Sequence, residues 1–271
     1  MARPRLLDLD RVSFRLTIGT LAGIAFFFLI FPTAIVLLTS FTSTASLRFP
    51  PPGYSLRWYA ALLDAHQMQQ AALNSLRVAA VATVLSVLLG ISGALAIARS
   101  TARWAKILDS IFMSPLLLPA LAFGFAALLY FSLIGVPLSL TTLVLGHVAV
   151  CVPFVLRTTI ASLAQLDPAL LDASLSLGAG RFFTFRRVTL PLIGRGIAAG
   201  AFLAFMASFD NVPVSLFLRD ARTDMLPIRM WQDLEGKLDV TIAAVSGVLI
   251  VFTIALMILM ERVAGLSRRL R

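Results

Sequence analysis

The chain of 271 residues is 59% hydrophobic and only 13% charged, with a mean hydropathy of +0.93. Soluble domains carry roughly 25% charged residues, so this composition excludes an ordinary soluble globular protein. The formal net charge is nevertheless +10, which means that the basic residues and the apolar residues occupy different parts of the chain.

Long stretches without charge predict an all-α integral membrane protein. A helix needs about 20 apolar residues to cross a bilayer. Four stretches contain no charged residue and a fifth contains one acid, Asp210; the five are residues 16–47, 78–98, 110–156, 240–260 and 196–218. Gly135 and Pro137 divide the longest stretch into two helices. We therefore predict a single transmembrane domain, residues 1–271, with six spans near residues 16–41, 72–98, 108–131, 139–163, 192–218 and 240–261.

The distribution of Lys and Arg predicts the orientation of these spans. With the N-terminus inside the cell, the inner segments carry fifteen basic residues and the outer segments carry six. Positive residues gather on the cytoplasmic side of membrane proteins, so both termini are predicted to be cytoplasmic. Attraction of the excess positive charge to anionic lipid headgroups explains these basic residues. We do not expect nucleic acid as a partner, because the basic runs adjoin apolar spans and lack a separate soluble domain.

The first outer loop, residues 42–70, predicts a short helix at the membrane surface. Ser55 is a suitable helix cap, and Trp58 and Tyr59 belong to the residue types that favour the interface. The last outer loop, residues 219–239, mixes acidic and basic residues and is predicted to be solvated. A docking surface for an extracytoplasmic partner is the alternative for that loop.

The inner loop between spans four and five, residues 164–191, predicts a short helix beneath the membrane. Asp167 followed by Pro168 is a preferred helix start, because the carboxylate accepts a bond from a free backbone N–H. Apolar residues at helical spacing follow, and Gly178 is suited to end the helix in a left-handed conformation. Pro191 is expected to start the fifth span. Such a helix suits contact with a cytoplasmic partner.

Asp210 is the acidic residue that lies well within a predicted span. It lies about 27 Å along that span from Leu192 at the helical rise, in the outer half of the membrane. A carboxylate there is costly unless it faces water, an opposite charge or a solute. We predict a position on a substrate path, shared with Asn211. Pairing with Arg77 or with a residue at a helix end, or exposure at a wide outer vestibule, is an equal alternative.

The reactive side chains predict neither a catalytic residue nor a metal site. The chain has one cysteine, Cys151, and two distant histidines, His66 and His147. This set offers little to a structural zinc or haem, and we interpret His147 and Cys151 as packed, neutral side chains. A membrane-embedded enzyme would need a cluster of catalytic groups at one depth, and none is found.

The inner loop resembles the signature of the membrane subunits of binding-protein-dependent ABC importers. That signature reads Glu-Ala-Ala, three residues, Gly, nine residues, Ile, one residue, Leu-Pro. The positions that match it here are Asp172, Ala173, Ser174, Gly178, Val188, Leu190 and Pro191. The departures are Asp for Glu, Ser for Ala and Val for Ile, which are small changes in size or charge.

Further stretches are similar to the polyamine (spermidine/putrescine) branch of these importers, in particular to its second permease subunit. They are residues 40–42, 54–59, 74–76 and 208–215 and the pair Pro115 and Pro119. Importers of ferric iron, phosphonates or other small solutes share much of this pattern, so these solutes stay as alternatives. The resemblance places the protein in a bacterial cytoplasmic (inner) membrane.

The resemblance implies a permease that pairs with a second permease as a heterodimer to form a pathway. Two ATP-binding subunits would lie below it, and an extracytoplasmic substrate-binding protein would dock outside. The helix around residues 172–178 would be the coupling helix, seated in a groove of the ATPase. No Gly-x-x-x-x-Gly-Lys-Ser/Thr loop is present, so this chain needs no cofactor, and ATP and Mg²⁺ belong to the partner ATPase.

A secondary transporter that works alone on an ion gradient is the rival prediction. Such a protein is expected to carry several ionisable groups within its spans and often an internal repeat. Away from the ends of the predicted spans, we find only Arg77, Arg157 and Asp210 as charged residues, without an obvious repeat. An ATP-driven permease is therefore the leading prediction.

Overall fold

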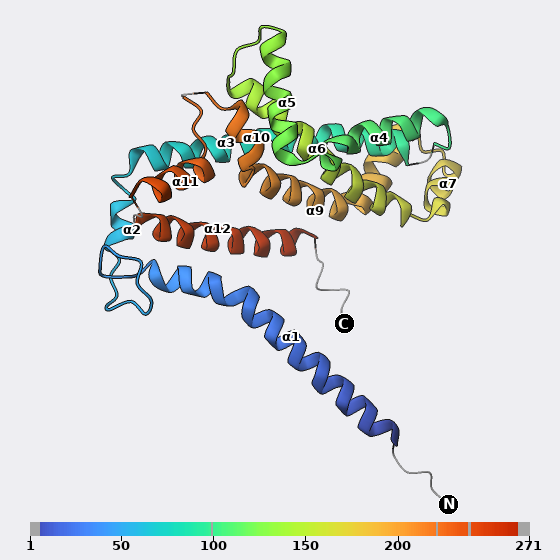
Figure 1. Cartoon of the computed structure of the whole chain (residues 1–271). Helices are drawn as coiled ribbons and strands as arrows, with labels where there is room; N and C mark the ends of the chain where they lie inside the picture. Colours follow the sequence, from blue (N-terminus) through green and yellow to red (C-terminus); the bar gives the residue numbers. More distant parts are fainter. Residues whose placement is uncertain (1–5, 99, 221, 238–239, 265–271) are drawn as a thin grey trace, which may run out of the picture. The chain divides into compact units, whose positions relative to one another are not determined.

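The computed structural model describes residues 6–98, 100–220, 222–237 and 240–264, and all the regular elements in these ranges are helices (Figure 1). In chain order they are α1 (Leu6–Thr39), α2 (Arg57–Ala61), α3 (His66–Ile97), α4 (Arg103–Leu117), α5 (Ala120–Leu133), α6 (Leu140–Ala164), α7 (Pro168–Ser176), α8 (Arg181–Thr184), the π-helical turn η1 (Phe185–Thr189), α9 (Leu190–Phe209), α10 (Val212–Leu218), α11 (Leu226–Lys237) and α12 (Thr241–Ala264). Within the described ranges, five helices are long and apolar enough to cross a membrane, and a bent pair brings the number to at most six.

The predicted third span is wrong as a continuous helix. Helices α4 and α5 meet at an angle of 108° across Leu118 and Pro119. Leu118 has an extended backbone (φ −88°, ψ 146°), because the ring of the following proline disfavours the helical conformation of the residue before it. The pair is therefore a broken span or a re-entrant segment.

The predicted fifth span is wrong at both ends. The helical run begins at Arg181, nearly three turns before Pro191, and continues through η1 into α9. The wide turn η1 ends at Thr189, two residues before Pro191, which cannot donate a helical hydrogen bond. At the far end, α9 stops at Phe209, and the separate helix α10 starts at Val212.

The last outer loop also differs from the prediction. We expected a solvated loop over residues 219–239, but residues 226–237 form helix α11. The loop before it is folded against the protein, since Met225 and Leu226 are fully buried. Mixed charge alone predicts exposure here, but the same segment contains the apolar residues Met225, Leu226 and Ile228, which are buried.

The chain divides into two compact units. The first contains residues 1–64 and 233–251, and the second contains residues 65–232 and 252–271. In the first unit, the short helix predicted for the first outer loop is present as α2. The indole N–H of Trp58 donates to the carbonyl of Thr42 (3.0 Å), and the hydroxyls of Tyr59 and Ser40 bond at 2.7 Å. These bonds fold the first outer loop onto itself.

The second unit is built on α3, α6 and α9, which pack closely because small residues line their contacts. A Cβ atom at Gly200 of α9 would lie 2.9 Å from the Cα atom of Val155 in α6. The buried core between these helices includes Val78, Leu143 and Ala204. In Figure 1, α7 lies at one end of this group and α10 lies nearer the other.

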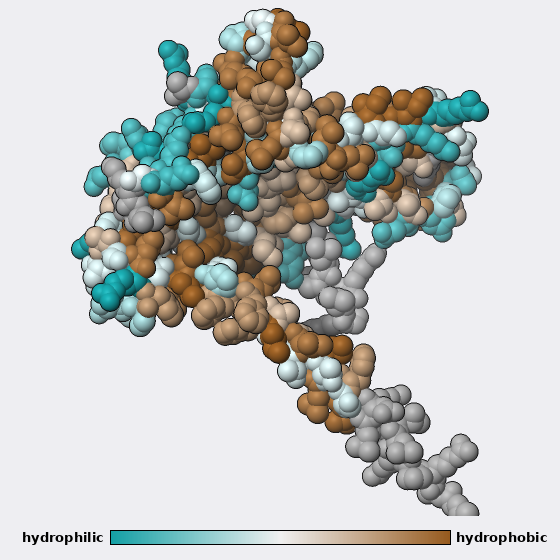
Figure 2. Space-filling view, in the orientation of Figure 1, coloured by the Kyte–Doolittle hydropathy of each residue, from teal (hydrophilic) through white to brown (hydrophobic). Residues whose placement is uncertain are grey.

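The outer surface of α5 is strongly apolar. Leu121, Phe125 and Leu133 are exposed on it, and Figure 2 shows hydrophobic residues over this helix. Large exposed apolar surfaces mark contacts with lipid or with a partner protein. This surface agrees with a helix that lies in a membrane.

Candidate functional site

The inner loop forms the short helix that the sequence predicts. The carboxylate Oδ1 of Asp167 accepts a hydrogen bond from the backbone N–H of Ala169 (2.9 Å), and Pro168 occupies the first turn of α7. These two residues satisfy or remove the free donors at the helix start. The helix therefore begins at a position that local chemistry specifies.

Gly178 ends this helix in the left-handed conformation, with φ +81°. The backbone N–H of Ala179 donates to the carbonyl of Ser174 (3.2 Å), and that of Gly178 donates to Leu175 (2.9 Å). Residues with a Cβ atom resist a positive φ, so the backbone conformation at this position requires glycine.

The loop presents apolar side chains to its surroundings. Leu177 is 88% exposed and Phe182 is 76% exposed, and Arg181 beside them is exposed as well. Underneath, Leu171 is buried, and the hydroxyls of Ser174 and Thr184 bond at 2.9 Å to tie α7 to α8. The result is a fixed turn with an uncovered apolar and basic surface, which suits a protein partner.

The signature residues of the inner loop fall into two groups. Asp172 and Ala173 lie exposed on α7, whereas Ser174 and Gly178 hold the turn as described above. The remaining members lie in the second half of the loop, on η1 and at the start of α9: Val188, Leu190 and Pro191. One folded unit, α7 to the start of α9, therefore contains them all.

Asp210 and Asn211 lie at the break between α9 and α10. Asp210 is exposed at the C-terminal end of α9, where its backbone N–H donates to Met206 (3.1 Å). The amide Oδ1 of Asn211 accepts from the backbone N–H of Val214 (3.0 Å) and caps α10, with Pro213 in the first turn. Asn211 thus has a structural task that the sequence prediction did not assign to it.

Asp210 does not pair with either arginine of the predicted spans. Arg157 bonds to Asp109 of α4 through its Nη2 atom (3.0 Å). Arg77 is exposed on α3 and borders an otherwise mostly apolar groove of about 310 Å³ that includes Leu140. Within the part of the chain that the structure describes, no ion pair involves Asp210. Exposure rather than pairing with Arg77 is therefore the arrangement found.

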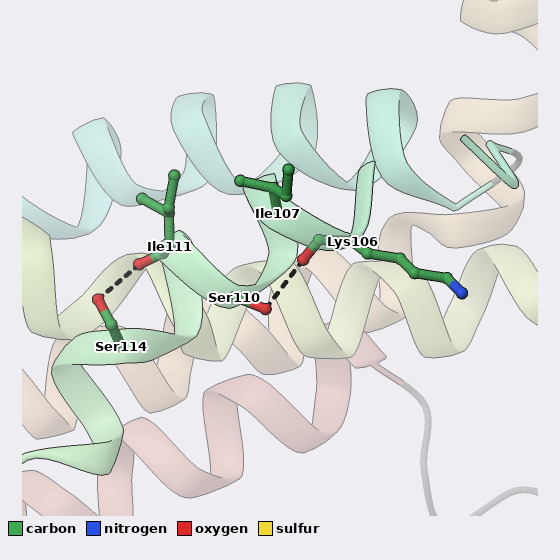
Figure 3. A pocket seen from close by; sticks show the side chains of 5 residues that line it. All are labelled: Lys106, Ile107, Ser110, Ile111 and Ser114. Carbon is green, nitrogen blue, oxygen red and sulfur yellow. Dashed lines mark hydrogen bonds between the residues drawn. The ribbon is translucent and has the colours of Figure 1, made fainter. Parts of the chain in front are cut away.

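A second surface groove, of about 390 Å³, runs along α4 and is lined by Lys106, Ile107, Ser110, Ile111 and Ser114 (Figure 3). The Ser110 hydroxyl donates to the carbonyl of Lys106 (2.9 Å), and the Ser114 hydroxyl donates to that of Ile111 (2.8 Å). Because both hydroxyls are used by the helix itself, this groove offers a solute little beyond one ammonium group.

Sequence reasoning missed a polar cluster around His147. The imidazole is fully buried on α6 and bonds through Nδ1 to the hydroxyl of Ser208 (2.8 Å) and through Nε2 to that of Ser215 (3.0 Å). Nearby, the Cys151 thiol contacts the carbonyl of Ala204 (3.3 Å). A buried polar group needs a hydrogen-bond partner, so a histidine within an apolar span was the signal in the sequence that could have indicated this cluster. Among the described residues, no group of three or more His, Cys, Asp or Glu side chains is placed to hold a metal.

Sequence reasoning also missed the polar residues that hold the last outer loop. The Asn74 amide of α3 donates to the carbonyls of Arg222 (3.4 Å) and Asp224 (3.1 Å). The Ser75 hydroxyl accepts from the backbone N–H of Leu226 (2.9 Å). Two side chains of one helix therefore fix the conformation of the segment between α10 and α11.

Asp220 organises the turn within that segment. The Thr223 hydroxyl donates to its carboxylate (2.8 Å), and so do the backbone N–H groups of Arg222 and Thr223 (2.8 and 2.7 Å). The hydrogen bond from the Thr223 side chain is the largest cause that holds the pKa of Asp220 below its ordinary value of 3.8. The turn is thus built on an ionised carboxylate.

Comparison with known proteins identifies the family. The family described as "Binding-protein-dependent transport system inner membrane component" matches residues 86–269. The chain is 28% identical to the spermidine/putrescine transport system permease protein PotC of Escherichia coli (strain K12), over 92% of this chain and 94% of that protein. It is 31% identical to the putrescine transport system permease protein PotI of the same strain, over 76% and 75% respectively.

The fold agrees with that identification. A crystal structure of a bacterial ABC transporter involved in the import of the acidic polysaccharide alginate has a TM-score of 0.71 and 17% identity, covering 98% of this chain and 99% of that one. The predicted resemblance is confirmed, and so is the predicted permease function. The chain belongs to the family of inner membrane components of binding-protein-dependent transport systems, and it is the permease of an ABC importer.

Proposed function

We propose that this permease carries polyamines, spermidine or putrescine, into the cell. The observation that carries the proposal is similarity to PotC along nearly the whole of both chains, supported by the match to PotI. The exposed carboxylate of Asp210 adds a physical argument, since polyamines are cations at neutral pH. An anionic solute such as a phosphonate would be repelled by that group.

The complete importer, in this proposal, contains a second permease in a heterodimer, two ATP-binding subunits that hold ATP and Mg²⁺, and an extracytoplasmic substrate-binding protein. The family's dependence on a binding protein supports the last partner. The lack of a phosphate-binding loop in this sequence supports a separate ATPase. The excess of basic residues on the inner segments supports six spans with both termini in the cytoplasm.

The inner loop is the proposed contact with an ATP-binding subunit, and α7 is its coupling helix. The exposed Leu177 and Phe182 offer apolar surface to a groove, and the fixed turn at Gly178 holds α7 at a constant angle to α8. A rigid unit transmits a push better than a mobile loop. Closure of the nucleotide sites would therefore move α9, which is continuous with this unit.

Asp210 is the proposed solute-facing residue. It lies where α9 ends, so its side chain is free of the intrahelical packing that a mid-helix position would impose. Asn211 supports it indirectly by capping α10.

The deciding experiment is reconstitution of this chain with its second permease, ATP-binding subunit and binding protein in proteoliposomes. We expect uptake of labelled spermidine or putrescine that requires ATP, and ATP hydrolysis that rises when the binding protein is loaded. Uptake by this chain alone on an ion gradient would favour the secondary transporter. ATP-driven uptake of ferric iron or a phosphonate, without polyamine uptake, would keep the permease and reject the polyamine.

A further inference from the structure

The buried His147 connects two helices across a gap in the backbone. Ser208 lies on α9, two residues before Asp210, and Ser215 lies on α10, four residues after Asn211. The two ring nitrogens of His147 reach one hydroxyl on each side of this break, at 2.8 and 3.0 Å. A single side chain of α6 therefore links the helices before and after Asp210.

Helix α10 is also pressed against α6 beside this histidine. A Cβ atom at Gly146 would meet the side chain of Leu218 and would lie 2.9 Å from Cγ1 of Val214. Val214, Ser215 and Leu218 are all buried. The close approach brings the backbone of α6 near enough for the neighbouring imidazole to reach across to both serines.

The break itself leaves the direction of α10 to such side-chain contacts. Residues within one helix are held by the backbone ladder, but the helical ladder stops at residues 210–211. The backbone bond across the break is a short local one, from the N–H of Val212 to the carbonyl of Asp210 (3.0 Å). The Asn211 side chain caps the start of α10, and its backbone N–H donates to the carbonyl of Ser208 at the end of α9 (3.3 Å). Both bonds are local to the break and neither continues the helical ladder from α9 into α10. The imidazole contacts both helices and is thus suited to set the angle between them.

We propose that His147 is a positioning residue for transport, which fixes the break between α9 and α10 and thereby holds the Asp210 carboxylate in place. The consequence for transport rests on the proposed role of Asp210 in the solute path. The structural part of the proposal does not depend on which solute is carried. The experiment therefore has two readouts, one for each part.

The structural readout is the reaction rate of a thiol placed on the buried face of α10. The complete transporter carries C151A, which removes the native thiol of this chain, and V214C, which supplies the thiol to be labelled. A small methanethiosulfonate reagent is applied to this parent and to variants that also carry S208A, S215A or both. We expect the double serine variant to react about tenfold faster, because it leaves the buried imidazole without partners. S86A is the matched control, since the Ser86 hydroxyl is buried and has no hydrogen-bond partner among the described residues. Equal rates in the double variant and the S86A control would overturn the proposal.

The functional readout is the amount of solute transported per ATP hydrolysed, measured per assembled complex. We expect S208A and S215A to lower this ratio several-fold and S86A to leave it unchanged. In a His147→Leu background neither serine variant should lower it further, because the shared partner is already gone. A role in folding alone would reduce the yield of complex and leave the ratio intact, which would refute the positioning role.

The two readouts also separate this inference from the proposed function. If the parent complex carries a solute other than a polyamine, the ratio is measured with that solute, and the labelling result is unaffected. Faster labelling with an unchanged ratio would overturn the link from His147 to Asp210 while the polyamine assignment stands.

Discussion

At the scale of single residues, three carboxylates of this protein show two different roles. Asp167 and Asp220 accept hydrogen bonds from backbone N–H groups and thereby build local structure. The carboxylate of Asp210 accepts no hydrogen bond in the described part of the chain, and this residue is exposed at a helix end. A carboxylate of the first kind is explained by the turn that it stabilises, and one of the second kind is available to a solute.

Neutralising Asp210 tests its proposed contact with a cationic solute. We expect Asp210→Asn to reduce polyamine uptake several-fold, an effect of about 1 kcal/mol for an exposed charge, and Asp210→Glu to retain most of it. Initial uptake rates in proteoliposomes measure the effect. Asp64→Asn, which removes another exposed carboxylate, is the control and should have no effect. Unchanged uptake by Asp210→Asn would reject the contact.

The low pKa of Asp220 predicts a pH-dependent contribution to stability. A pKa that is lower in the folded state than in the unfolded state stabilises the fold above the unfolded value, and this stabilisation is lost as the pH falls through the folded value. Wild type should therefore melt at a higher temperature than Asp220→Asn at pH 7. The difference should shrink when the pH is lowered below 4. A difference that is constant over this range would contradict the role of the ionised form.

At the scale of elements, the helix–turn unit from α7 to α9 is specified almost entirely by local chemistry. The start at Asp167, the end at Gly178 and the return toward α9 follow from capping and backbone conformation. Sequence reasoning therefore predicted α7 closely. Pro191 does lie in the first turn of α9, but the prediction missed that the helical run extends back through the wide turn η1 to Arg181.

Gly178 and Gly180 form a matched pair for testing this unit. Gly178 has φ +81°, whereas Gly180 has φ −70°, and neither would meet another atom if it gained a Cβ. We expect Gly178→Ala to strain the turn by about 1–2 kcal/mol and to lower transport-coupled ATP hydrolysis. Gly180→Ala should behave as wild type. ATP hydrolysis by the reconstituted importer is the measurement, and equal activities would show that the turn is not involved in coupling.

At the scale of the whole molecule, contacts between segments distant in sequence decide where the outer loop lies. Ser75 and Leu226 are far apart in the chain, yet their hydrogen bond holds a loop that charge alone predicted to be solvated. His147 likewise makes contacts that are distant in sequence, because its hydrogen-bond partners lie 61 and 68 residues away along the chain. Such contacts concern one compact unit, residues 65–232 and 252–271.

Removing the Ser75 hydroxyl tests how much this long-range contact contributes. We expect Ser75→Ala to destabilise the protein by about 1–3 kcal/mol, because the backbone N–H of Leu226 is then buried without a partner. Ser86→Ala on the same helix removes a hydroxyl that has no hydrogen-bond partner in the described part of the chain, and it should change stability much less. Thermal unfolding of the purified complex gives the comparison. Equal losses would mean that the bond has no net effect.

The sequence by itself determined the membrane class, the approximate places of the long helices and the ends of α7. These features depend on apolar length and on bonds between residues a few positions apart, which can be read along the chain. The tertiary structure alone decided that the spans near residues 118–119 and 210–211 are broken, that Asn211 is a cap, and that His147 joins Ser208 to Ser215. An apolar stretch has the same composition whether its helix is straight or broken, and the partner of a buried polar group is found only when distant helices meet.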